Sequence, residues 1–71
     1  MGRYFVTTRR SERGSAPTAA DAVADEPGVK VVNATDPHSV TIEATEDTAE
    51  RLRNKLAETH FVEPEIRRSL H

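Results

Sequence analysis

The feature that most constrains the fold of this chain is that it is short and has no cysteine. Because none of its 71 residues is a cysteine, neither a disulfide framework nor a thiolate metal site can add stability. A chain of this length forms one domain and removes only about 60% of its unfolded surface from water on folding. We therefore expect a single domain over residues 1–71, with a thin core held by packing alone.

Charge and hydropathy argue against two classes of partner. Ten Lys and Arg residues stand against twelve Asp and Glu residues, and this net charge of −2 creates no field that would gather phosphate groups. No segment approaches the roughly 20 apolar residues of a membrane span, and the N-terminus lacks the apolar stretch of a signal peptide. We expect neither a nucleic acid nor a membrane as partner, and a cytoplasmic protein unless the chain is excised from a secreted precursor.

The first part of the chain predicts a strand, a loop and a short helix. Residues 3–8 are rich in aromatic and β-branched side chains, as strands are, and the polar residues 9–15 are typical of a loop. Residues 17–25 place alanine and valine at helical spacing, and a Pro-Gly pair follows them. Ser15 and Thr18 are the two candidates for the N-cap of this helix.

The second part predicts a hairpin and a stronger helix. Residues 29–33 are β-prone and residues 40–44 alternate apolar and polar side chains, so the turn-forming residues between them would make a hairpin. Residues 45–56 predict the strongest helix of the chain, with Thr45 as its N-cap. The apolar face of this helix is expected to enter the core through Ala49, Leu52 and Leu56.

A short last strand completes the expected fold. The run Phe61-Val62-Glu63 predicts this strand, and Pro64 restricts it to a sheet edge or an end because proline cannot donate to the ladder. The order βαββαβ, with right-handed crossovers, predicts an α+β fold of the ferredoxin-like class, in which two helices cover one face of a four-stranded antiparallel sheet. The uncovered face and the segment after the last strand are therefore the places where we expect function.

The residue pattern predicts neither catalysis nor metal binding. His38, His60 and His71 lack the i,i+4 or cysteine-linked spacing that chelation requires, and we expect all three on the surface. A Ser-His-Asp site needs a water-excluding pocket, which a core this thin can hardly build. The expectation is a protein that is not an enzyme and that has no cofactor or metal site.

Five segments carry a resemblance to a known family through their order and spacing. They are Tyr4-Phe5-Val6, Pro27-Gly28-Val29, residues 40–44, the set Ala49, Leu52 and Leu56, and Phe61-Val62-Glu63-Pro64-Glu65 with six residues after it. Across essentially its whole length, the chain resembles the propeptide inhibitors of subtilisin-like serine proteases. The resemblance implies inhibition of such a protease, with folding-chaperone activity toward it as a further expectation.

The resemblance also implies which residues meet the protease. Glu63 and Glu65 correspond to acidic residues that cap the N-termini of two helices on the protease surface, where unpaired N–H groups and the helix dipole stabilise a carboxylate. Residues 66–71 correspond to a tail that lies in the active-site cleft like a cleaved product, held by main-chain hydrogen bonds of strand addition. This tail is Ile66, Arg67, Arg68, Ser69, Leu70 and His71.

Several alternatives stay open at this point. If His71 fills the primary specificity pocket, Arg68 falls at the fourth subsite, where subtilisins commonly take an apolar residue. Leu70 is the other candidate for the primary pocket, and a protease with acidic subsites would suit the arginines. A second hypothesis is a non-catalytic ferredoxin-like module for protein interaction or oligomerisation through the open sheet face. Under the inhibitor hypothesis we expect the free protein to be a monomer.

Overall fold

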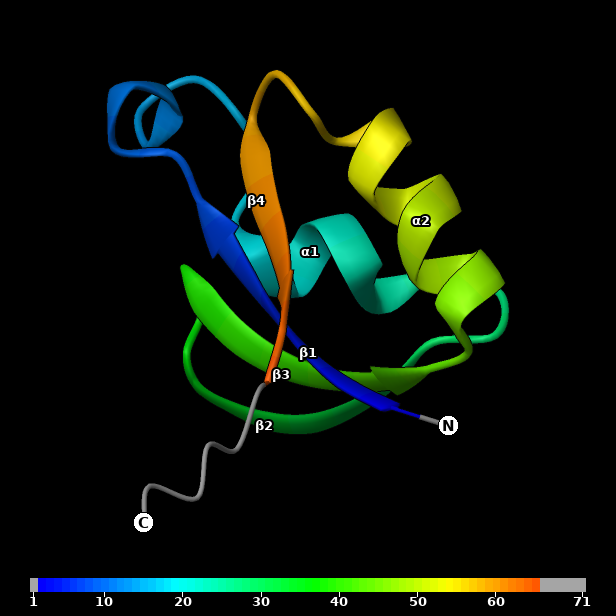
Figure 1. Cartoon of the computed structure of the whole chain (residues 1–71). Coiled ribbons are helices and arrows are strands. Elements are labelled where there is room, and N and C mark those ends of the chain that lie inside the picture. Colours follow the sequence, from blue (N-terminus) through cyan, green and yellow to red (C-terminus); the bar gives the residue numbers. More distant parts are fainter. Residues whose placement is uncertain (1, 66–71) are drawn as a thin grey trace, which may run out of the picture.

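The sheet is antiparallel throughout, with the strand order β2-β3-β1-β4 (Figure 1). The computed structural model describes residues 2–65. The elements are β1 (Gly2–Thr8), a 3₁₀ helix η1 (Arg10–Glu12), α1 (Ala19–Ala24), β2 (Lys30–Asp36), β3 (Ser39–Ala44), α2 (Glu46–Lys55) and β4 (His60–Pro64). The predicted α+β, ferredoxin-like fold is therefore confirmed.

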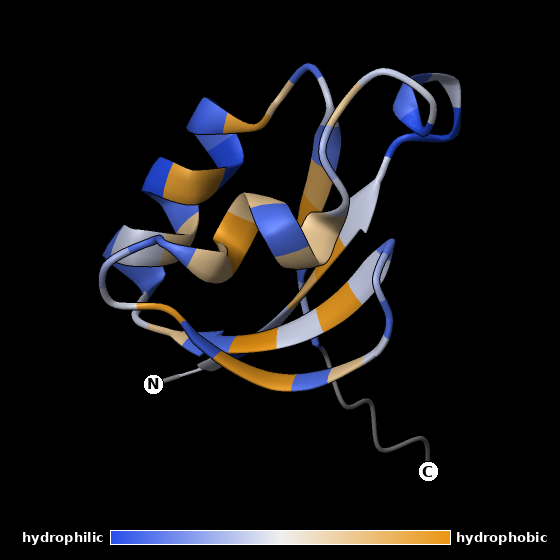
Figure 2. Cartoon of the chain, turned by 180° about the vertical axis from the view of Figure 1, so that it is seen from behind, coloured by the Kyte–Doolittle hydropathy of each residue, from blue (hydrophilic) through white to orange (hydrophobic). Residues whose placement is uncertain are grey.

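Both helices cover the same face of the sheet. α1 packs against β1, β2 and β3, and α2 packs against β4, so the helices form one layer and the strands the other (Figure 1). Hydrophobic positions alternate with polar ones along the sheet (Figure 2), because successive side chains of a strand point to opposite faces. In residues 2–65 no helix is long and apolar enough to cross a membrane.

The core lies between the two layers and is built mostly from aliphatic side chains, with Tyr4 as its aromatic member. It contains no phenylalanine, since both phenylalanines are exposed. At about 25 cal/mol per Å² of buried apolar area, side chains of this size contribute less each than large aromatic ones. The buried core residues are Tyr4, Val6, Ala19, Val23, Val40, Ile42, Ala44, Ala49, Leu52 and Val62.

α1 is shorter than expected from residues 17–25. It begins after Thr18, whose hydroxyl oxygen accepts a hydrogen bond from the backbone N–H of Asp21 at 3.1 Å. Of the two candidate caps, Thr18 is therefore the N-cap. Pro17 precedes the N-cap, and its carbonyl oxygen lies 2.9 Å from Nε2 of His60.

α2 begins where the sequence predicts. The hydroxyl oxygen of Thr45 accepts a hydrogen bond from the backbone N–H of Thr48 at 3.2 Å. The carboxylates of Glu46 and Asp47 in the first turn are stabilised by the positive end of the helix dipole. Ala49 and Leu52 are buried, and Leu56, which follows the helix as its C-cap, packs against the core. The expected apolar face is confirmed.

The Thr45→Ala variant is expected to lower the free energy of unfolding by about 1 kcal/mol, because the first turn of α2 loses its side-chain acceptor. Chemical denaturation followed by circular dichroism measures this difference. Thr45→Ser retains the hydroxyl and is the matched control, with an expected loss below about 0.5 kcal/mol. Equal losses in the two variants would contradict the capping role.

β2 and its turn differ from the expected hairpin. β2 runs on to Asp36, so the turn is shorter than the six residues 33–38 and lies at Pro37 and His38. The carboxylate of Asp36 accepts from the backbone N–H of His38 at 3.0 Å, which closes the turn locally. η1 is a second difference, because it lies in the segment 9–15 that was expected to be a loop.

The expectation that all three histidines lie on the surface is wrong for His60. Its side chain is 2% exposed, because it shares the helix-covered face of β4 with Val62. Its Nε2 lies 2.9 Å from the carbonyl oxygen of Pro17, and its Nδ1 lies 2.7 Å from the hydroxyl of Thr59. His60 thus satisfies both ring nitrogens inside the core and joins β4 to the segment that enters α1.

Candidate interaction surface

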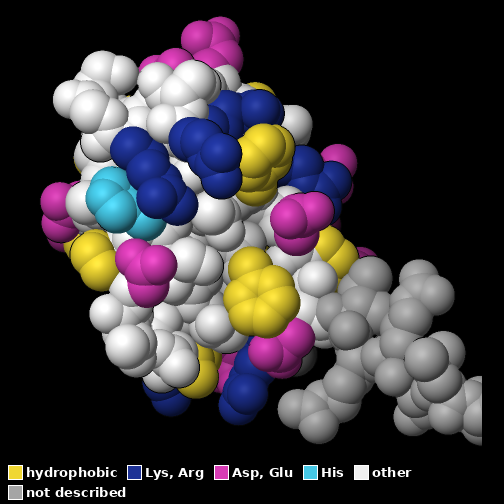
Figure 3. Space-filling model, turned by 90° about the vertical axis from the view of Figure 1, so that its left-hand side faces the viewer, with side chains coloured by type: hydrophobic (Ala, Val, Ile, Leu, Met, Phe, Trp, Pro, Cys, Tyr) yellow, Lys and Arg dark blue, Asp and Glu magenta, His cyan; other side chains and the backbone are white. Residues whose placement is uncertain are grey.

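The face of the sheet that the helices leave open carries the two exposed phenylalanines. Phe5 on β1 is 40% exposed and Phe61 on β4 is 44% exposed. Figure 3 views the molecule from this side and shows hydrophobic side chains beside basic and acidic ones. Two exposed aromatic side chains on one face make it a candidate interaction surface. The side chains on this face include Arg3, Phe5, Thr7, Thr41, Glu43, Phe61 and Glu63.

Phe61 is held in place by Arg9. The guanidinium carbon of Arg9 lies 4.2 Å from the centroid of the Phe61 ring, within the range of a cation–π interaction. The Nε and Nη2 of Arg9 donate to the carbonyl oxygen of Ala57 at 3.0 and 2.7 Å. The backbone N–H of Arg9 donates to the carbonyl oxygen of Thr59 at 2.8 Å. The guanidinium is held by three contacts and the backbone of Arg9 by a fourth, which gives one end of the open face a defined, basic and aromatic surface.

Phe5 is surrounded by charged side chains. The strand register sets Phe5 between Thr41 on β3 and Glu63 on β4. Arg3, two positions earlier on β1, forms an ion pair with Glu43 across the β1–β3 ladder, with an N–O distance of 3.8 Å. An exposed pair of this kind contributes at most about 1 kcal/mol, so its main effect is to position charges around an apolar centre.

Glu63 and Glu65 lie where β4 ends. Glu63 is exposed and faces Phe5 across the β1–β4 ladder. The backbone N–H of Glu65 donates to the carbonyl oxygen of Arg3 at 2.8 Å, which extends the pairing one step beyond β4 and leaves Glu65 half-buried. Both carboxylates are thus carried by one edge of the sheet. The other predicted site residues, 66–71, lie outside the described residues.

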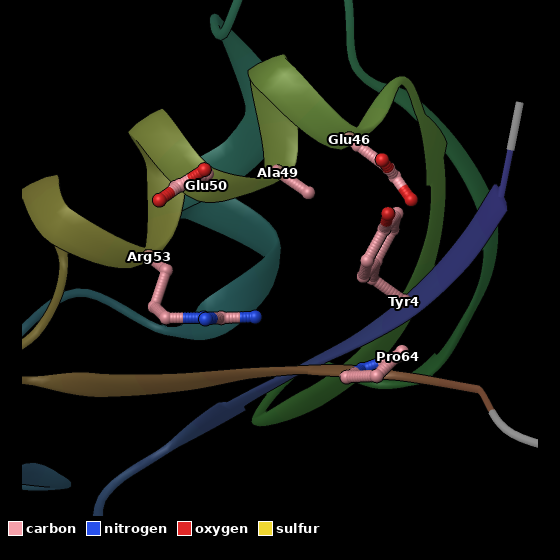
Figure 4. Close-up of a pocket in the computed structure, with 6 residues that line it drawn as sticks. All are labelled: Tyr4, Glu46, Ala49, Glu50, Arg53 and Pro64. Carbon is pink, nitrogen blue, oxygen red and sulfur yellow. The ribbon is translucent and has the colours of Figure 1, made fainter.

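A shallow cavity of about 300 Å³ lies on the opposite side, between α2 and the β1–β4 edge (Figure 4). Tyr4 points from β1 toward Glu46 on α2, and Arg53 extends from the same helix (Figure 4). The mixture of carboxylate, guanidinium and phenol groups makes this surface polar. The lining residues are Tyr4, Glu46, Ala49, Glu50, Arg53 and Pro64.

The described residues 2–65 contain no group of three or more His, Cys, Asp or Glu side chains placed to hold a metal ion. His38 is half-buried near the β2–β3 turn, with Nδ1 3.3 Å from the hydroxyl of Thr8, and His60 is in the core. The predicted absence of enzymatic activity stays a prediction.

Sequence reasoning did not include Arg9, Phe5 or Phe61 among the site residues. The signal for the phenylalanines was present in the alternation of the strands, since Phe5 lies between the inward-facing Tyr4 and Val6. No local signal could place Arg9 over Phe61, because 52 positions separate the two residues and only the β1–β4 pairing brings them together.

The fold and this open face define a small ferredoxin-like α+β domain with an exposed apolar and charged sheet surface. Comparison with known proteins found no matching family model, no matching curated protein and no matching solved structure. The functional assignment therefore depends on the residues of this chain and their arrangement.

Proposed function

We propose that this protein is an inhibitor of a subtilisin-like serine protease, with residues 66–71 bound in the active-site cleft in a product-like manner. The observation that carries the proposal is the position of the last strand. β4 is an edge strand that presents Glu63 beside the open face and anchors Glu65 to β1. The two proposed helix-capping carboxylates and the origin of the proposed tail therefore lie at one edge of a rigid sheet.

The open face supports docking of this kind. A sheet face with Phe5 and Phe61 exposed can cover apolar surface on a partner, while carboxylates at its border meet the N–H groups of helix N-termini. The described residues thus provide both an apolar contact and acidic groups next to it. Folding-chaperone activity toward the same protease would use the same surface, since a domain that binds only the folded protease stabilises it.

The anchoring of β4 supports the proposed role of the tail. A free peptide loses conformational entropy when it binds in a cleft, and attachment to a preformed domain reduces this loss. The 2.8 Å hydrogen bond from Glu65 to Arg3 orders the chain up to the residue before the proposed tail. The arginines at positions 67 and 68 favour a target protease with acidic subsites, and either His71 or Leu70 would occupy its primary pocket.

Titration of a panel of subtilisin-type proteases with the protein tests the proposal directly. The panel includes enzymes with apolar and with acidic fourth subsites, and residual cleavage of a chromogenic peptide is measured. We expect inhibition in the nanomolar to micromolar range for at least one enzyme, strongest where the subsites are acidic. A panel in which every enzyme retains full activity at 100 μM protein would end the proposal.

Replacing both carboxylates in the double variant Glu63→Ala, Glu65→Ala is expected to weaken protease binding by roughly 3- to 30-fold. This range assumes about 0.3–1 kcal/mol for each carboxylate at a helix N-terminus. The inhibition constant is measured at low and at high salt, because screening should reduce the difference. The control is Glu46→Ala, Glu50→Ala, which removes the same charge from α2 on the covered side of the sheet. Equal inhibition constants for both double variants would remove the helix-capping role.

The exposure of Phe5 and Phe61 also favours a second candidate function, a non-catalytic module for protein interaction or oligomerisation through the open face. The double variant Phe5→Ser, Phe61→Ser separates the two functions. A module of the second kind loses partner binding or self-association without any effect on proteases, which size-exclusion chromatography with light scattering detects.

A further inference from the structure

The β2 edge of the sheet is unpaired and carries exposed apolar side chains. In the strand order, β2 has β3 on one side and no strand of residues 2–65 on the other. All seven residues of β2 are exposed, including Val31 at 40% and Val32 at 41%. An edge of this kind presents backbone donors and acceptors that can pair with another strand.

The sequence of β2 is complementary to itself when two copies run antiparallel. With Asn33 at the centre, Lys30 faces Asp36 of the second copy, and Asp36 faces Lys30 of the second copy. Lys30 pairs with Glu43 and Asp36 with Ser39 across the β2–β3 ladder, so both lie on the open-face side of β2. Directly opposed side chains of an antiparallel pair share a face. The two opposite charges would therefore meet on the same side of the joined sheet.

The irregularities of β2 fit the same symmetry. The β2–β3 register shifts twice, once between Val31 and Asn33 and once between Asn33 and Asp36. A two-fold axis at Asn33 sets the first irregular segment of one copy against most of the second of the other, so the two strands would have to pair across both bulges. In this pairing residues 30–33 of one copy face residues 33–36 of the other. The backbone N–H of Thr35 is already bonded to the side chain of Asn33 at 3.0 Å, so the new main-chain bonds would come from pairs other than Val31 with Thr35.

We propose that two copies of this protein associate through antiparallel pairing of their β2 strands, with Lys30 of each copy against Asp36 of the other. The two four-stranded sheets would join into one continuous sheet. The pairing leaves both β4 edges at the far ends, because β4 lies at the opposite side of the sheet from β2. The exposed β2 edge thus changes the expectation of a monomer, and the inference does not depend on the proposed protease inhibition.

The dimer is expected to be weak. A single strand pair buries less than the roughly 1,200 Å² of a stable interface, and exposed charge pairs contribute little individually. Association should therefore depend on concentration in the high-micromolar range and weaken with salt. β4 is a poorer edge for self-pairing, because Pro64 removes one donor.

Dilution experiments on the unaltered protein test the pairing without any substitution. Sedimentation equilibrium from about 10 μM to 2 mM should show a mass that rises from 7.9 kDa toward twice that value. Over the same range, amide chemical shifts in NMR spectra should change mainly at Lys30 to Asp36. A constant monomer mass overturns the proposal, as do concentration-dependent shifts centred on Phe5 and Phe61, which would indicate the open face instead.

Charge variants test the register. Lys30→Glu and Asp36→Lys each set like charges against each other twice in a symmetric dimer, so each alone should lower the association constant at least about 10-fold. Mixing the two variants restores opposite charges at both positions and should yield a heterodimer. Arg53→Glu on α2 makes the same change in net charge as Lys30→Glu and should leave association within about two-fold. Single variants that dimerise as the unaltered protein does, or a mixture without heterodimer, overturn the pairing.

Discussion

Removal of residues 66–71 is expected to abolish measurable inhibition of the target protease, with a loss in affinity of about 100-fold or more. A segment that adds as a strand to the protease makes several main-chain hydrogen bonds, each with a net value of about 0.5–1.5 kcal/mol. Three such bonds correspond to roughly 10- to 2,000-fold in affinity, and the side chains of the tail add to this. The truncated protein retains every residue of the sheet and both helices.

The measurement is the inhibition constant of the truncated protein beside that of the full chain. The control is a chain of full length in which the order of residues 66–71 is scrambled, so that length and composition stay the same. Circular dichroism and thermal unfolding should coincide for all three proteins, since the core lies within residues 4–62. A truncated protein that inhibits as well as the full chain would show that the tail is not the inhibitory element.

Ile42→Ala is expected to lower the free energy of unfolding by about 2–5 kcal/mol, a large part of the roughly 5 kcal/mol expected for a domain with so thin a core. Ile42 is 0% exposed and lies at the centre of the sheet, paired with Tyr4 on β1 and Val31 on β2. The neighbouring side chains are mostly valine and alanine, which cannot expand into the space that the substitution leaves.

Urea denaturation measures this change, and Val31→Ala is the matched control. Val31 lies directly across the β2–β3 ladder from Ile42 but is 40% exposed, so its truncation should cost less than about 1 kcal/mol. The comparison separates loss of core packing from loss of β propensity. Similar losses in the two variants would contradict the assignment of Ile42 to the centre of the core.

The proposed surfaces lie at different parts of the molecule and can be tested separately. Glu63 and Glu65 belong to the β4 edge, whereas Lys30 and Asp36 belong to the β2 edge on the other side of the sheet. Lys30→Glu is therefore expected to lower the association constant at least about 10-fold while changing protease inhibition less than the double variant at the two glutamates does. The double variant at the two glutamates should do the reverse.

The amino-acid sequence alone determined the elements whose signals are local. The alternation in residues 40–44 predicts β3, and Thr45 followed by two acidic residues predicts the start of α2, because period-2 patterning and N-cap chemistry act between near neighbours. The order of these elements was sufficient to predict the ferredoxin-like topology, since right-handed crossovers permit few arrangements. The assignment of Glu63 and Glu65 as site residues follows from the resemblance to propeptide inhibitors, and their functional role is a proposal.

Only the tertiary structure decided which side chains meet and which other edge of the sheet is free, because these depend on residues far apart in the sequence. His60 is in the core because Pro17, 43 positions earlier, offers its carbonyl oxygen at 2.9 Å. Arg9 meets Phe61 because β1 and β4 pair. β2 became a candidate for self-association once the strand order left it at an edge. Contacts between segments far apart in the sequence decide each of these outcomes, and the pattern within one segment does not specify which distant residue is met.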